Sequence, residues 1–99
     1  MLTHVVLFRV ADLAVASECR DRMLAMKGRI PPLLDIEVGV DIVRSERSFD
    51  LALITRHDDL DGMQAYQVHP VHQELLGWVK PRVKQAVAVD FVSARTVGA

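Results

Sequence analysis

Cysteine is almost absent from this sequence, because Cys19 is the only one among 99 residues. With a single thiol, no disulfide can form within the chain, which is typical of proteins in a reducing compartment. Neither sign of charge dominates, since 12 basic residues are balanced by 13 acidic ones. This balance argues against the broad basic surface that attracts nucleic acid or an anionic membrane. We therefore expect neither of these partners.

Long apolar runs are also missing. A membrane-spanning helix needs roughly 18 consecutive apolar residues, and no stretch of the sequence approaches that length. The first ten residues contain a short apolar run that Arg9 interrupts, without the basic start of a signal peptide. We therefore expect a cytoplasmic protein. Because 51% of the residues are hydrophobic and 25% are charged, we expect residues 1–99 to form one globular domain.

Hydrophobic periodicity predicts four strands. They cover residues 3–10, 34–43, 48–57 and 85–93. The second strand is the clearest, because its apolar residues alternate with Asp35, Glu37 and Asp41. The short polar stretch 44–47 between the second and third strands predicts a hairpin. Residues 94–99 are expected to form a short tail.

Three helical segments are predicted between the strands. They cover residues 16–28, a stretch after Asp59, and residues 70–79. Asp12 or Ser17 can cap the first segment, and Asp58 or Asp59 can cap the second. Pro70 separates the second from the third, because a proline disfavours helical backbone in the residue before it and suits the first turn of a helix.

The resulting order is β-α-β-β-α-β, which is the ferredoxin-like split βαβ pattern of the α+β class. We therefore expect a four-stranded antiparallel sheet with the helices on one face. The other face would keep apolar side chains from Val5, Leu7, Ala52, Ile54, Val87 and Val89. Since an exposed apolar sheet face predicts a partner, we expect a homodimer formed through this face.

The side chains best suited to chemistry lie in and near the segment from Tyr66 to His72. Both residues fall on the inner stripes of their helical segments, and the break at Pro70 lets them converge. His4 points from the first strand toward the same space. A neutral histidine can take a proton near pH 7, and a phenol can donate a hydrogen bond to a carbonyl oxygen. The set therefore suits proton abstraction beside a carbonyl, with His72 as general base and Tyr66 as hydrogen-bond donor.

Other interpretations of these residues stay open. A histidine and a tyrosine on apolar faces are more often hydrogen-bonded core residues than catalysts. His69 lies at the helix junction, where a capping or structural role is expected. Metal binding by His69, His72 and Glu74 has weak support, because the sequence contains no tight ligand spacing such as H-E-x-x-H. We expect neither a metal nor a cofactor.

Five short segments of the sequence form a recognisable set. They are His4 to Phe8, Ile36 to Asp41, Phe49 to Ile54, Tyr66-Gln67-Val68-His69-Pro70-Val71-His72, and Val89 to Phe91. Together they resemble the stress-responsive A/B barrel (Dabb) family of the dimeric α/β barrel superfamily, over nearly the whole chain. The resemblance implies a homodimer in which two sheets form one barrel.

The Tyr-x-x-His-Pro-x-His segment is similar to that of one plant member of the family, olivetolic acid cyclase, which closes a linear polyketide without a cofactor. This similarity implies that Tyr66 and His72 form an acid/base pair. The candidate substrate-binding residues are His4, Val6, Phe8, Met23 and Leu53. The helix at residues 16–28 lacks the aromatic residues that line the cyclase pocket, so the resemblance does not imply a polyketide substrate.

Three functions are therefore compared. The first is a homodimer without assigned activity, either structural or binding a small apolar carbonyl compound. The second is a cofactor-free, polyketide-cyclase-like lyase that uses Tyr66 and His72. The third is a monooxygenase, haem-degrading or cofactor-independent, and it is disfavoured because such relatives rely on a pocket asparagine and this sequence contains none.

Overall fold

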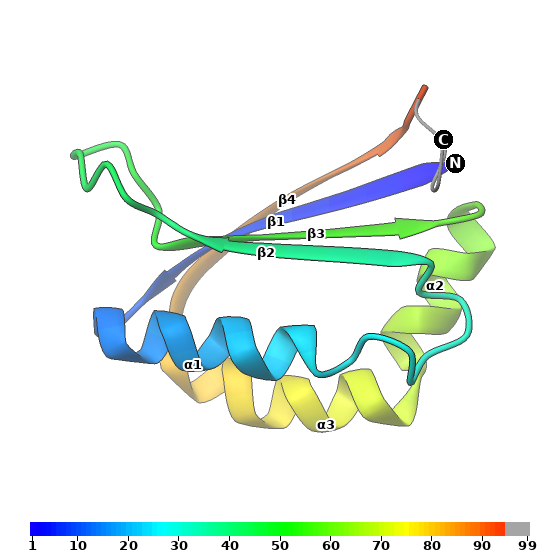
Figure 1. Ribbon diagram of the computed structural model, residues 1–99, viewed down its shortest axis with the longest axis horizontal. Helices are drawn as coiled ribbons and strands as arrows, with labels where there is room; N and C mark the ends of the chain where they lie inside the picture. Colours follow the sequence, from blue (N-terminus) through cyan, green and yellow to red (C-terminus); the bar gives the residue numbers. More distant parts are fainter. Residues whose placement is uncertain (95–99) are drawn as a thin grey trace.

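The computed structural model describes residues 1–94, and the rest of the predicted tail, residues 95–99, lies outside the described residues. The elements are β1 (Leu2–Val10), α1 (Leu13–Leu24), β2 (Asp35–Val40), β3 (Leu51–His57), α2 (Leu60–Val68), α3 (Pro70–Val79), the short 3-10 helix η1 (Lys80–Arg82) and β4 (Val83–Val92). The antiparallel sheet has the strand order β2-β3-β1-β4, and α1, α2 and α3 lie on one side of it (Figure 1). The predicted ferredoxin-like α+β architecture is confirmed.

Helix α1 differs from its prediction at both ends. It begins at Leu13, because Asp12 is the cap and its carboxylate accepts a hydrogen bond from the Ala14 N–H at 2.8 Å. It ends at Leu24, four residues before the predicted end. The chain then passes through turns, and Gly28 there has a φ of 79°, which favours glycine.

Strands β2 and β3 are shorter than predicted, because residues 41–50 form a loop that extends beyond the sheet (Figure 1). Arg44 has a φ of 59°, and its guanidinium contacts Asp50 at 2.8 Å and Asp41 at 3.2 Å. Asp50 also accepts a hydrogen bond from the Val10 N–H at 2.7 Å, which ties the base of the loop to the end of β1. These side-chain contacts hold the loop where ladder hydrogen bonds were predicted.

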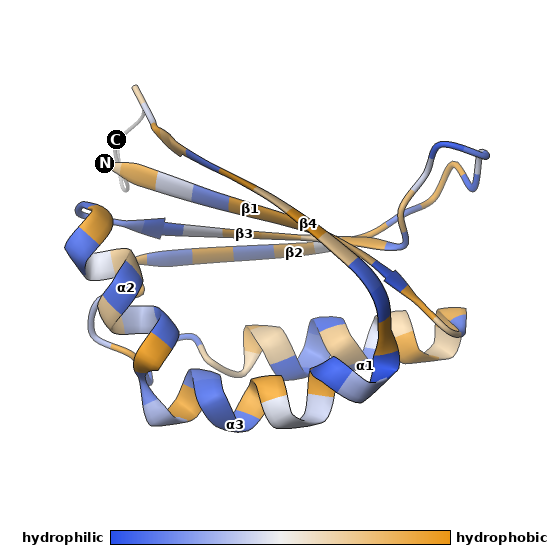
Figure 2. Ribbon diagram, turned by 180° about the vertical axis from the view of Figure 1, so that it is seen from behind, coloured by the Kyte–Doolittle hydropathy of each residue, from blue (hydrophilic) through white to orange (hydrophobic). Residues whose placement is uncertain are grey.

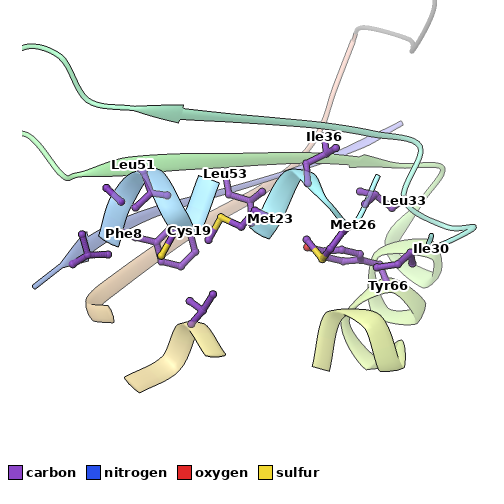
Figure 3. Packing of buried hydrophobic residues seen from close by; sticks show 13 residues of the cluster. Phe8, Cys19, Met23, Met26, Ile30, Leu33, Ile36, Leu51, Leu53 and Tyr66 are labelled. Atoms are coloured by element: carbon purple, nitrogen blue, oxygen red, sulfur yellow. The ribbon is translucent and has the colours of Figure 1, made fainter. Parts of the chain in front are cut away.

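The core lies between the sheet and the helices (Figure 3). Helix α1 contributes Ala16, Cys19 and Met23, which are at most 1% exposed. These side chains pack with residues of the strands, of the loop after α1 and of α2, including Phe8, Met26, Ile30, Leu51, Leu53 and Tyr66. The buried residues of α1 recur every three or four positions, as expected for one face of a helix.

The opposite face of the sheet is not covered by any element of residues 1–94. Its apolar residues form two rows across neighbouring strands, Val5 with Ile54 and Val89, and Leu7 with Ala52 and Val87. Leu7 is 38% exposed, Val87 43% and Val89 63%. Hydrophobic positions recur along β1 and β4 in Figure 2. The uncovered face therefore carries the six apolar residues that the sequence places there.

Candidate functional site

Helices α2 and α3 meet at His69, which ends the first and caps the second. His69 is extended, with φ −63° and ψ 139°, and its Nδ1 accepts a hydrogen bond from the Val71 N–H at 3.1 Å. Pro70 occupies the first position of α3, where its missing N–H costs no helical hydrogen bond. The predicted break at Pro70 and the predicted capping role of His69 are both confirmed.

His72 lies in the first turn of α3, and its ring is partly buried. Its Nδ1 lies 2.9 Å from the carbonyl oxygen of Gln67. Because a carbonyl only accepts, Nδ1 carries the hydrogen, and Nε2 of the neutral ring keeps its lone pair. Burial lowers the pKa of His72, and positive charge on His4 and Lys80 lowers it further, although the hydrogen bond to Gln67 works in the other direction. The ring is therefore suited to accept a proton at Nε2.

Tyr66 is completely buried between two imidazole rings. Its ring centroid lies 4.5 Å from that of His72 and 4.9 Å from that of His57. Figure 3 shows the side chain extending from α2 into the core. Burial raises the pKa of Tyr66, so the phenol stays protonated. Within residues 1–94, its hydroxyl has no hydrogen-bond partner.

His57, on the other side of Tyr66, is fully satisfied. Its Nδ1 donates to the carbonyl oxygen of Pro32 at 2.8 Å, and its Nε2 accepts from the Thr55 hydroxyl at 2.9 Å. The ring is buried, and burial lowers its pKa. With both nitrogens engaged in the neutral form, His57 has a structural role.

His4 on β1 is hydrogen-bonded through Nδ1 to the carboxylate of Asp90, its direct neighbour on β4. The carboxylate holds the imidazole in the tautomer that leaves Nε2 unengaged. Sequence reasoning did not assign Asp90 to the site. A signal was present, because Asp90 is the one charged residue between Gln85 and Ser93, in a strand that is otherwise apolar.

A cavity of about 360 Å³ lies between the sheet and the helices. The sheet and α1 supply His4, Val6, Phe8, Met23 and Leu53, and α2 and α3 supply Gln67, Val68, His72, Gln73, Leu75, Leu76 and Val79. The five residues predicted as substrate-binding thus line the same cavity as His72. Tyr66 does not line the cavity and instead lies behind His72. Gln67, Val68 and Gln73 also line the cavity, although the sequence pattern did not indicate them.

The wall is mostly apolar and contains two imidazoles, which can exchange protons with a bound molecule. In the described part of the chain, no group of three or more His, Cys, Asp or Glu side chains is placed to hold a metal ion. None of the described helices is both long and apolar enough to cross a membrane.

The family description of the stress-responsive A/B barrel domain (Dabb) matches residues 2–93. This chain belongs to the Dabb family. No curated protein sequence matches this Dabb domain. Two similar structures are described as dimeric, ferredoxin-like and of unknown function. The one from Bacteroides fragilis is 26% identical with a TM-score of 0.81, over 91% of this chain and 93% of that chain. The one from Thermobifida fusca is 28% identical with a TM-score of 0.75, over 93% of this chain and 90% of that chain.

A third similar structure is the hydroxynitrile lyase from Passiflora edulis. It is 13% identical to this Dabb domain with a TM-score of 0.80, over 96% of this chain and 94% of that chain. At this level of identity, the likeness shows the fold alone.

Proposed function

We propose that this Dabb domain is a homodimer whose cavity between sheet and helices binds a small apolar carbonyl compound. The cavity carries this proposal, because about 360 Å³ lies within the range of small-molecule sites. Its polar side chains are only His4, Gln67, His72 and Gln73. Mostly apolar walls with a few polar groups are typical of such sites, and the polar groups fix the orientation of the ligand. The side-chain amide N–H groups of Gln67 and Gln73 would donate to the carbonyl oxygen.

Binding can be tested with acetophenone, a small apolar ketone, by NMR titration of 15N-labelled protein. Leu76 lines the cavity from α3, and a Leu76→Trp variant should fill part of it and abolish binding. Leu24 lies outside the lining on α1, so Leu24→Trp serves as the matched control and should bind like the wild type. If Leu76→Trp bound acetophenone as tightly as the wild type, the cavity would not be the binding site.

The dimer is supported by the uncovered apolar sheet face and by the dimeric descriptions of the two bacterial structures. Val89 is 63% exposed on that face, and burying apolar area there would stabilise association by about 25 cal/mol per Å². Light scattering should give the mass of a dimer for the wild type and for the control Leu24→Asp, but of a monomer for Val89→Asp. A monomeric wild type at micromolar concentration would contradict the proposal.

A second candidate function is cofactor-free proton abstraction, as in a polyketide-cyclase-like lyase. The free Nε2 of His72 at the cavity wall favours it, since a neutral imidazole there can remove a proton beside a carbonyl. Tyr66 would be the hydrogen-bond donor, because its hydroxyl is protonated and unpartnered within residues 1–94. Since Tyr66 lies behind the wall, the His72 ring must turn aside for this role.

The test of this candidate is turnover of small β-ketocarbonyl compounds. A rate that disappears in His72→Gln and falls in Tyr66→Phe would support both assignments. A rate that Tyr66→Phe leaves unchanged would exclude the tyrosine, and a rate that His72→Gln leaves unchanged would exclude the base.

A further inference from the structure

Two imidazoles face the cavity from opposite layers, His4 from the sheet and His72 from the helices. In both rings Nδ1 is already hydrogen-bonded, so Nε2 is the nitrogen left for a bound molecule. Their Nδ1 partners differ in charge. His72 donates to the neutral carbonyl of Gln67, and His4 donates to the carboxylate of Asp90.

This difference assigns different roles to the two rings. A carboxylate behind an imidazole compensates the positive charge that the ring gains with a second proton, more strongly than a neutral carbonyl does. Positive charge on His4 also lowers the pKa of His72, so the two rings disfavour being protonated together. The carboxylate behind His4 therefore suits that ring to donate a proton, and the neutral carbonyl behind His72 suits that ring to accept one.

We propose that His4, positioned by Asp90, is a second acid–base group of the cavity and acts as the acid opposite the base His72, on an enolisable ketone. The inference rests on the proposed binding function and names the reaction that the site supports. Asp90 does not line the cavity, so it is a positioning residue that acts through His4. In this arrangement the donor already lines the cavity, and the His72 ring does not have to turn aside.

The step conserves atoms and charge. His72 Nε2 takes a proton from the carbon next to the carbonyl, and the electron pair of that C–H bond forms a C=C bond. The π electrons of the carbonyl move to its oxygen, which receives the Nε2 proton of protonated His4. The ketone becomes its enol, His72 carries the proton that the carbon lost, and exchange with water restores both rings. In D2O the reverse step places deuterium on the carbon.

The experiment combines a structural and a chemical readout. The 15N shifts of the histidine rings report whether one or both nitrogens of His4 carry a hydrogen, and 1H NMR in D2O follows deuterium exchange into the methyl group of acetophenone. Asp90→Ala removes the Nδ1 partner of His4, so the ring should no longer be held in one tautomer. The exchange rate at saturating ketone should fall by about 10- to 100-fold, with little change in ketone affinity. Asp90→Asn keeps a hydrogen-bond acceptor and should restore part of the rate.

Two variants complete the series. His4→Gln should slow exchange at least as much as Asp90→Ala. Glu37 is an exposed carboxylate on β2 outside the cavity, so Glu37→Ala should match the wild type and controls for the loss of surface charge.

The outcomes separate the two proposals. If acetophenone does not bind the wild type, the proposed binding function fails, and this inference fails with it. If acetophenone binds but exchange is no slower in His4→Gln and Asp90→Ala, the inference alone is refuted. Exchange that depends on Tyr66 and not on His4 would assign the donor role to the tyrosine.

Discussion

The hydroxyl of Tyr66 gives a prediction whose sign runs against ordinary expectation. Replacing a buried tyrosine by phenylalanine commonly destabilises a protein, because the hydroxyl usually has a partner. Here the side chain is 0% exposed, and its oxygen has no partner within residues 1–94. We therefore expect Tyr66→Phe to stabilise the fold.

The magnitude follows from the cost of burying an unsatisfied polar group, which is about 1–3 kcal/mol. The phenylalanine ring keeps the contacts with His57 and His72, so little packing is lost. A gain of about 1 kcal/mol is therefore the lower expectation. For a domain of this size, about 1 kcal/mol corresponds to a rise in Tm of roughly 4–8 °C.

Thr55 supplies the matched comparison, because it also carries a fully buried hydroxyl. That hydroxyl is bonded to Nε2 of His57 at 2.9 Å. Thr55→Val keeps the shape but leaves the imidazole nitrogen unpaired, which should cost about 1–3 kcal/mol. Deleting one buried hydroxyl should therefore raise the stability, and deleting the other should lower it.

The assay is urea denaturation followed by circular dichroism, at one fixed protein concentration because dimer dissociation makes stability depend on concentration. A loss of 1 kcal/mol or more in Tyr66→Phe would refute the reasoning. It would mean that the hydroxyl is hydrogen-bonded in solution, for example to a buried water.

Three further predictions concern stability. Burial lowers the pKa of His57 and of His72, so as the pH falls the unfolded chain takes up protons near pH 6.5 before the folded chain does. The free energy of unfolding should therefore decrease as the pH is lowered from about 7.5 to about 5.5. The decrease should be smaller in His57→Gln. Asp59→Ala removes the cap of α2 and should cost about 1 kcal/mol in urea denaturation, whereas Asp58→Ala should have little effect. Met23→Ala should cost about 2–5 kcal/mol and, where the protein remains folded, admit bulkier ketones in the NMR titration.

The parts of the fold that depend on local chemistry could be predicted from the sequence. The alternation of apolar and polar residues around Ile36 and Val38 indicates a strand, and Pro70 gives the exact position at which α3 begins. The start of α1 was missed, because the first turn carries exposed Leu13 and Ala14 and so lacks the inner stripe on which the prediction depended.

The candidate site depended on contacts that no local pattern contains. Asp90 lies 86 residues from His4, and only the pairing of β1 with β4 makes them neighbours. The inner stripe of α2 correctly includes Tyr66, but periodicity cannot distinguish a side chain in a cavity wall from one in the core. The packing of His57 and His72 against its ring decides that question.

The pairing of β1 with β4 has a consequence for how the protein is made. A ribosome produces β1 first and β4 last, and the two strands pair from Leu2 with Val92 to Val10 with Val83. One edge of β1 therefore stays unpaired until almost every described residue has been synthesised. His4 gains its Asp90 partner only then, so we expect the acid–base set to be completed only once β4 has been synthesised, in a slow step dominated by long-range contacts.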